Sequence, residues 1–110
     1  MLNQIVLVGR LVSDPELRET ESGNKVTNIV LAVPRNFKNT KGEYDTDFIS
    51  CVLWKAIAEN TANYCKKGDL VGIKGRVQNR EYEVDNEKKQ VTEIVVEKIN
   101  FLASAKTKEA

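Results

Sequence analysis

The chain of 110 residues contains no histidine and only two cysteines, two prolines and one tryptophan. The lack of histidine removes the most common general base and the most common zinc ligand. A serine or cysteine nucleophile then lacks its usual partner, so we expect a protein that is not an enzyme. Cys51 and Cys65 do not form a Cys-x-x-Cys pair, and we expect two reduced, buried thiols and no metal, redox centre or other cofactor.

A charge excess of one sign and long apolar runs are also missing. The net charge is +1, from 17 basic and 16 acidic residues, so only the distribution of charge can indicate a nucleic-acid partner. The amino terminus lacks the basic start and apolar run of a signal peptide, and no apolar stretch is long enough to cross a bilayer. We therefore expect a cytoplasmic protein that has neither a membrane nor a small-molecule substrate as partner.

The pattern of apolar residues predicts strands and a single helix. The third strand is the most informative, because Ile49, Cys51 and Leu53 share one face suited to a core, and Phe48, Val52 and Trp54 share the other. The expected strands are Asn3–Val12, Val26–Val33, Asp47–Trp54, Leu70–Arg80 and Val91–Leu102, and the expected helix is Ala56–Lys67.

The connecting segments carry further expectations. Residues 36–45 are polar and are expected to form a loop, and the charged residues 81–90 are expected to form a hairpin loop. Lys66 and Lys67 are expected in the last turn of the helix. Positive charge there stabilises the helix terminus, and we take this stabilisation as the main role of the two lysines. The apolar phase of the last strand slips near Glu97, which predicts a bulge there.

This order of elements predicts an all-β fold. Three strands, one helix and two strands fit an OB-fold, a five-stranded Greek-key barrel with its helix between the third and fourth strands. Sandwiches and small up-and-down barrels have similar strand counts and remain alternatives. We expect one domain over residues 1–102 and a short, polar, disordered tail over residues 103–110.

Aromatic and basic side chains gather on the predicted strands. The aromatic residues that can line one groove are Phe37, Phe48, Trp54 and Tyr82, and the basic residues on or beside the same faces are Arg35, Lys74, Arg76 and Arg80. Aromatic rings stack on unpaired bases and basic side chains neutralise phosphates, so this mixture favours single-stranded nucleic acid over duplex. Each aromatic also has an ordinary interpretation as a core, hairpin or subunit-contact residue. The basic residues have an ordinary interpretation as a solvated strand face. A face that docks another protein and an RNA-binding groove remain alternatives.

Several motifs then resemble one family. The segments are Leu2–Leu11 (LNQIVLVGRL), Asp14–Arg18 (DPELR), Asp47–Phe48 with Trp54, Tyr64–Gly68 (YCKKG) and Gly75–Arg76. From Met1 to about Leu102 the chain resembles the bacterial single-stranded-DNA-binding proteins. The resemblance implies an OB-fold, homotetramers, and sequence-tolerant binding and protection of single-stranded DNA in replication, repair, recombination or DNA uptake.

The resemblance also implies roles for particular residues. The stacking aromatics of the family fall on the four aromatics already named. Its basic contacts fall on Arg18, Lys67 and Arg80, with Arg10, Arg35, Lys74 and Arg76 as neighbours. Its subunit-pairing strand falls on Asn3, Gln4, Ile5, Val6, Leu7 and Val8. Most members continue into a long tail whose acidic tip recruits replication and repair proteins. This chain has no such tip, so it resembles the short forms and recruitment of that kind is not expected.

Overall fold

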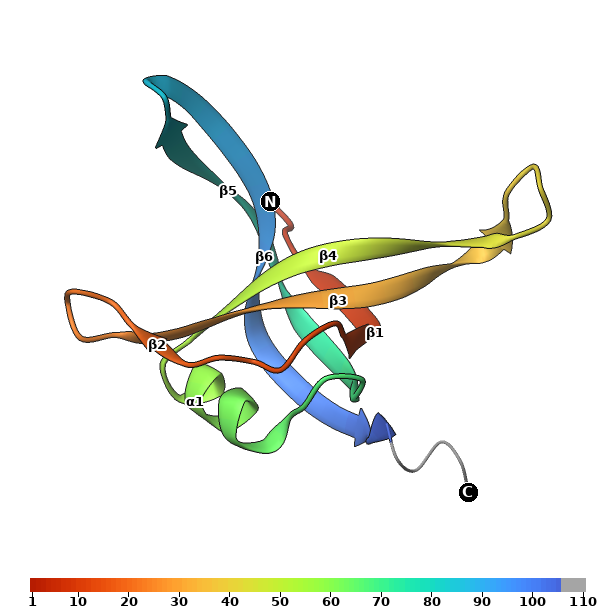
Figure 1. Ribbon diagram of the computed structural model, residues 1–110, viewed down its shortest axis with the longest axis horizontal. Helices are drawn as coiled ribbons and strands as arrows, with labels where there is room; N and C mark the ends of the chain where they lie inside the picture. The colour runs from red at the N-terminus through yellow and green to blue at the C-terminus, as the bar shows by residue number, and fades with distance from the viewer. Residues whose placement is uncertain (106–110) are drawn as a thin grey trace.

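The structure is a computed structural model that describes residues 1–105 (Figure 1). The expected disorder of the tail falls mainly on residues 106–110, which lie outside the described residues, whereas Ala103 belongs to the last strand. The elements in chain order are β1 (Ile5–Leu11), β2 (Arg18–Glu19), β3 (Lys25–Lys38), β4 (Tyr44–Trp54), α1 (Lys55–Tyr64), β5 (Leu70–Val84) and β6 (Glu87–Ala103).

The five long strands close into a barrel. β1 pairs with β5, β5 with β6, and β3 with β4, all antiparallel, and β4 pairs with β6 in parallel. The antiparallel pairing of β1 with β3 completes the closure, and the short β2 adds to the outer edge of β3. The helix lies between β4 and β5 in sequence, so the predicted OB-fold is confirmed.

The barrel interior holds the apolar core. The predicted core positions Cys51 and Leu53 are buried, and Ile49 packs beside them as a partly buried residue. The other buried members come from the facing strands and the helix: Leu11, Ile29, Leu31, Ala58, Cys65, Val71, Ile73, Ile94 and Val96. Val52 points to the opposite face as predicted, yet it is buried, because the walls of a surface groove cover it.

Two pairs of strands continue well beyond the barrel as arms, and here the predicted loops are too long, although each contains a hairpin turn. β3 and β4 extend together until a short turn over residues 39–43, and β5 and β6 until a turn at Asp85 and Asn86 (Figure 1). Both of these turn residues have a positive φ, the geometry of a tight hairpin. Pairing between the two strands of each arm provides hydrogen-bond partners for the backbone N–H and C=O groups even where the side chains are polar. The pattern of hydrophobic residues does not report that pairing.

The predicted end of the helix is also wrong. The helix ends at Tyr64, and the backbone N–H of Cys65 donates to the carbonyl of Thr61 at 3.0 Å. Lys66 lies in the following turn, where its N–H donates to Oδ2 of Asp69 at 2.8 Å. Asp69 thus ends the helical path three residues earlier than expected, and Lys66 and Lys67 do not cap the helix.

The predicted bulge in the last strand is confirmed. Lys74 lies opposite Lys98 and Gly75 opposite Val96, so Glu97 has no partner on β5. Gly75 allows the strands to approach closely there, because a Cβ atom on it would lie 2.2 Å from the carbonyl oxygen of Val95. The bulge lets β6 turn from the barrel wall toward the arm.

Candidate nucleic-acid interface

A groove runs across the outer face of β3, β4 and β2. It consists of two adjoining hollows that share Arg18 and Asn28. The first, of about 400 Å³, is lined by Arg18, Thr20, Val26, Asn28, Val52, Trp54, Gln78, Arg80 and Glu93. The second, of about 550 Å³, is lined by Ser13, Asp14, Glu16, Arg18, Asn28 and Lys67. We call these two hollows together the groove.

The position of Trp54 follows from strand geometry. It is the last residue of β4 and lies opposite Val26 of β3, on the face that points away from the core. Lys55, which follows it and begins α1, has a positive φ of 61°. Trp54 lines the first hollow and is 40% exposed. A flat aromatic surface therefore stays open to solvent.

Arg80 and Glu93 form the opposite wall of the groove. The Nε atom of Arg80 and the Nε2 atom of Gln78 both donate to Oε1 of Glu93, at 3.1 and 3.4 Å. Arg76 in turn donates from Nη1 to Oε1 of Gln78 at 3.0 Å. Glu93 is only 7% exposed, so a nearly buried carboxylate lies beside the basic side chains.

Lys67 and Arg18 lie along the second hollow. The backbone N–H of Lys67 donates to Oδ1 of Asp14 at 2.7 Å, which fixes the turn after the helix against the segment before β2. Arg18 lies in β2 opposite Val26 and lines both hollows. Within residues 1–105, neither cation forms an ion pair, so both charges are available to an anionic ligand.

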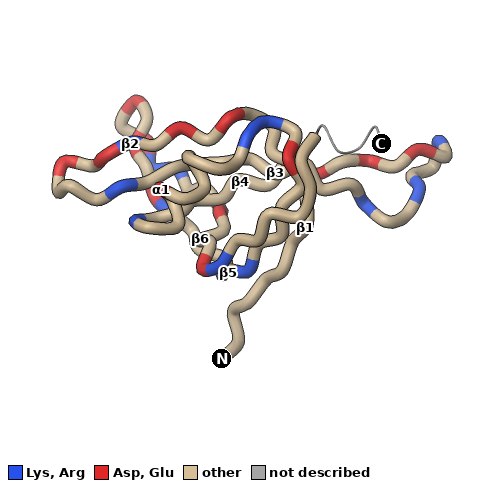
Figure 2. The backbone as a smooth tube through the Cα atoms, turned by 90° about the horizontal axis from the view of Figure 1, so that it is seen from below, with Lys and Arg blue, Asp and Glu red and all other residues tan. Residues whose placement is uncertain are grey.

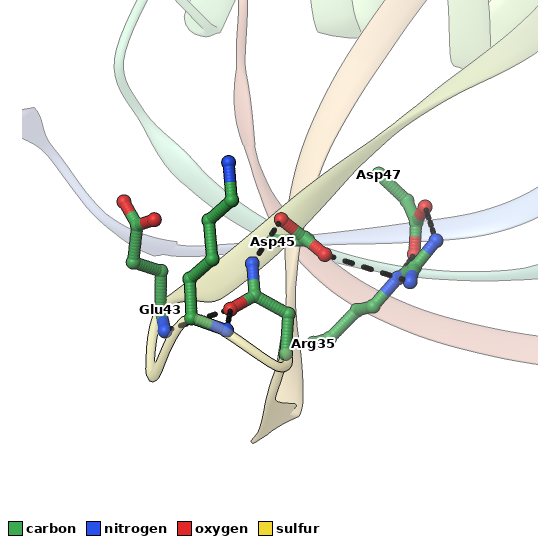
Figure 3. A network of polar contacts seen from close by, with 6 residues as sticks. Arg35, Glu43, Asp45 and Asp47 are labelled. Atoms are coloured by element: carbon green, nitrogen blue, oxygen red, sulfur yellow. Dashed lines mark hydrogen bonds and ion pairs between the residues drawn. The ribbon is translucent and has the colours of Figure 1, made fainter.

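The β3–β4 arm carries two of the predicted aromatics on opposite faces. Phe48 lies opposite Ala32, on the same face of β4 as Trp54, and is widely exposed. The guanidinium carbon of Arg35 lies over the ring of Phe37, 5.9 Å from its centre. Arg35 also donates from Nε and Nη2 to the two carboxylate oxygens of Asp47 at 3.0 Å (Figure 3). The side chain of Asp47 points away from the Phe48 face, because neighbouring residues of a strand alternate.

The pairing of Arg35 with Asp47 has an electrostatic consequence. The hydrogen bond to Arg35 lowers the pKa of Asp47, and the same contact raises the pKa of Arg35. A second carboxylate, that of Asp45, lies 3.9 Å from Arg35. Arg35 was a candidate phosphate contact, but its charge is already neutralised by these two acids.

Three other candidates lie apart from the groove. Tyr82 is on the β5–β6 arm opposite Lys89, on the same face as Arg80 but beyond it. Lys74 lies opposite Val6 and lines a separate hollow of about 350 Å³. Arg10 donates from Nη1 to the carbonyl of Gly68 at 2.9 Å and so ties β1 to the turn after the helix. The groove thus unites Trp54 with the three cations that the family resemblance put first: Arg18, Lys67 and Arg80.

Sequence reasoning missed the polar residues of the groove. Asn28, Gln78 and Glu93 line it, and none was a candidate. One signal was present, since Glu93 directly precedes the apolar Ile94 and therefore lies on the opposite face of β6, the face of Val91 and Val95. That alternation places Glu93 on the outward face of a central strand.

The predicted subunit-pairing segment leaves apolar side chains exposed. Val6 is 70% exposed and Val8 49%, and both line the separate hollow together with Leu102. Asn3 is held in place by two hydrogen bonds to the backbone of Val77, at 2.8 and 2.9 Å. The exposed apolar side chains of Val6, Val8 and Leu102 thus form one surface, which we call the β1 face.

Charge is mixed over the molecule. Figure 2 shows Lys and Arg segments interspersed with Asp and Glu segments along the chain, in keeping with the net charge of +1. In the part of the chain that the structure describes, no helix has the length and hydropathy needed to cross a membrane. Residues 1–105 also contain no cluster of three or more side chains arranged to hold a metal ion.

The fold and the groove together define an OB-fold protein whose outer face can accommodate an extended, flexible polymer. Residues 2–102 match the model of the single-strand binding protein family. The chain belongs to this family.

Known relatives are similar over most of the chain. It is 55% identical over 105 residues to single-stranded DNA-binding protein 3 of Listeria innocua, covering 94% of this chain and 66% of that protein. It is 48% identical to single-stranded DNA-binding protein B of Bacillus subtilis, covering 93% of this chain and 91% of that protein. It is 52% identical to single-stranded DNA-binding protein 1 of Streptococcus agalactiae, covering 99% of this chain and 68% of that protein. The chain thus spans about two thirds of some relatives and nearly the whole of another.

Proposed function

We propose that this protein binds single-stranded DNA without sequence specificity and protects it, and that it performs no catalysis. The observation that carries the proposal is the open ring of Trp54 in one hollow with Arg18 and Arg80. A base stacked on an aromatic ring contributes about 1–3 kcal/mol, whichever base it is. Cations on both sides of the ring attract the phosphates that flank a stacked base.

The form of the groove favours a single strand over a duplex. In a duplex the base faces are stacked on each other, so they are not available to a protein ring. The proposed strand path runs from Lys67 past Arg18 to Trp54 and Arg80, because the two hollows adjoin. Phe48 and Tyr82 lie on the two arms that extend from the groove, and they are proposed as further stacking positions.

We further propose that the protein acts as a homotetramer in DNA replication, repair, recombination or uptake. The β1 face supports self-association, because Val6, Val8 and Leu102 expose apolar side chains side by side. Burial of that face against a second copy removes apolar surface from water, and each Å² of apolar surface removed stabilises the contact by about 25 cal/mol. The number of four copies is proposed because homotetramers are typical of the family.

The test uses the only tryptophan as its reporter. Titration with long oligo-thymidine is expected to quench the fluorescence of Trp54, to saturate at a defined number of nucleotides, and to weaken as salt is raised. Competition with oligo-uridine and with duplex DNA measures the preference for the single DNA strand. Saturable binding without quenching would place the strand elsewhere on the protein, and an absence of binding would overturn the proposal.

A further inference from the structure

Tyr44 lies at the outer end of the β3–β4 arm. It is the first residue of β4 and its side chain is 58% exposed. Side chains alternate along a strand, so Tyr44 faces the same way as Phe48 and Trp54. About 33 Å of strand separates Tyr44 from Trp54, at about 3.3 Å per residue. Three aromatic rings thus lie along one face of a single strand, leading outward from the groove.

A cation accompanies the ring of Tyr44. Lys38 is its partner across the arm, and the Nζ atom of Lys38 lies 5.9 Å from the centre of the ring. Among the described residues, Lys38 forms no ion pair with a carboxylate. Arg35, by contrast, is paired with Asp47 on the other face of the arm. The Tyr44 face therefore keeps an open ring and an uncompensated positive charge together.

The tip of the arm is held in one shape by a network around Asn39. Its Oδ1 atom accepts from the backbone N–H of Lys41 at 2.8 Å and of Glu43 at 3.0 Å, and its Nδ2 atom donates to Asp45 at 3.1 Å. Asp45 also approaches Arg35, so the network joins the tip to the body of the arm (Figure 3). Tyr44 lies between Glu43 and Asp45, and the network therefore fixes its backbone before any ligand arrives.

We propose that Tyr44, together with Lys38, is a further stacking position for single-stranded DNA at the tip of the β3–β4 arm. The inference rests on the proposed function of the groove, which it extends along the Phe48 face. The occupant is a nucleotide of the bound strand, because an open ring beside an uncompensated cation matches a base and its phosphate. The ordered tip lowers the conformational entropy that binding would otherwise cost.

The experiment compares variants on a series of oligo-thymidines of increasing length, with quenching of Trp54 as the readout. Tyr44→Ala is expected to lower the affinity for long strands about 5- to 100-fold, and to leave the shortest strands that quench Trp54 unaffected. Tyr44→Phe keeps the ring and is expected to bind as the parent does. Lys38→Gln is expected to make the slope of log affinity against log salt shallower by about 0.7. Tyr64→Ala, which removes a still more exposed tyrosine at the end of α1, is the matched control.

The outcomes separate this inference from the function on which it rests. No quenching in the parent protein would overturn the proposed function. Normal quenching with an unchanged affinity of Tyr44→Ala for long strands would overturn only the role of Tyr44. An equal loss in Tyr44→Phe or in Tyr64→Ala would also overturn it, because stacking at this position predicts neither. Light scattering on Tyr44→Ala tests contact with a second copy, and a lower mass would assign Tyr44 to a subunit interface instead.

Discussion

The Nε atom of Arg80 donates a hydrogen bond to Oε1 of Glu93 at 3.1 Å, inside the groove that Trp54 lines. Arg80 is more than half exposed, whereas the carboxylate of Glu93 is almost buried. A phosphate that approaches Arg80 therefore meets a cation already engaged by an acid that cannot move away into solvent. Glu93 orients the guanidinium toward the groove and at the same time competes for its charge.

Replacing Glu93 by Gln is expected to strengthen binding of single-stranded DNA. The amide keeps an oxygen that accepts from Arg80, and it removes the negative charge that competes with phosphate. The slope of log affinity against log salt should become steeper by about 0.7, the value for one more neutralised phosphate on a single strand. Fluorescence titrations of Trp54 at several salt concentrations measure both quantities. Glu59→Gln removes a charge on the helix and serves as the control; weaker binding by Glu93→Gln would contradict the competition.

Replacing Val6 by Arg is expected to break the proposed oligomer. Lys74 and Lys98 line the same hollow as Val6, so they would repel a third cation there. Burial of the new charge in an interface would also cost free energy. Size-exclusion chromatography with light scattering should show a fall from four chains toward fewer. Val84→Arg, at the end of the β5–β6 arm, adds the same charge to another exposed valine and should keep the parent mass. A tetramer that survives Val6→Arg would remove the β1 face from the assembly.

Replacing Gly75 by Ala is expected to lower the free energy of unfolding by about 1–3 kcal/mol. The new Cβ atom would lie 2.2 Å from the carbonyl oxygen of Val95, and a backbone atom within a paired strand cannot be displaced cheaply. Gly72→Ala is the matched control three residues earlier in β5, because its Cβ atom would lie 3.5 Å from Leu102, an ordinary contact. Urea unfolding of both variants measures the difference, and equal stabilities would show that the bulge at Glu97 adapts.

The thiol of Cys51 is expected to resist alkylation in the folded protein. Burial, and then the charge of Glu93, raise its pKa from 9.0 to about 12, so the reactive thiolate is nearly absent at pH 8. The same shift favours folding below about pH 9, and this contribution falls away as the pH rises from 9 toward 12. Iodoacetamide labelling followed by peptide mass spectrometry should find Cys51 modified only in denaturant. Rapid labelling of the native protein would show that the barrel opens there.

The core face of β4 and the outward position of Trp54 were predictable from the sequence because both depend on local alternation, and the barrel was predictable from the order of the elements. Residues 49, 51 and 53 point inward and residue 54 outward in any extended strand, wherever the partner strands lie. The bulge at Glu97 was visible for the same reason, as a slip in the phase of apolar residues. The family resemblance added Arg18 and Lys67, for which strand alternation gave no signal.

Hydrogen bonds and ion pairs between particular residues, which the side-chain pattern does not report, decided the rest. The polar arms are strands because their backbones pair with each other, which the side-chain pattern does not report. Asp69 ends the helix at Tyr64 through a hydrogen bond that depends on the fold of the turn. Whether a cation is available also depends on its neighbours in space: Asp47 neutralises Arg35 and Glu93 engages Arg80, whereas Lys67 and Arg18 stay unpaired within residues 1–105. The sequence by itself determined which residue types occur on each strand face, and only the tertiary structure decided which charges remain open to DNA.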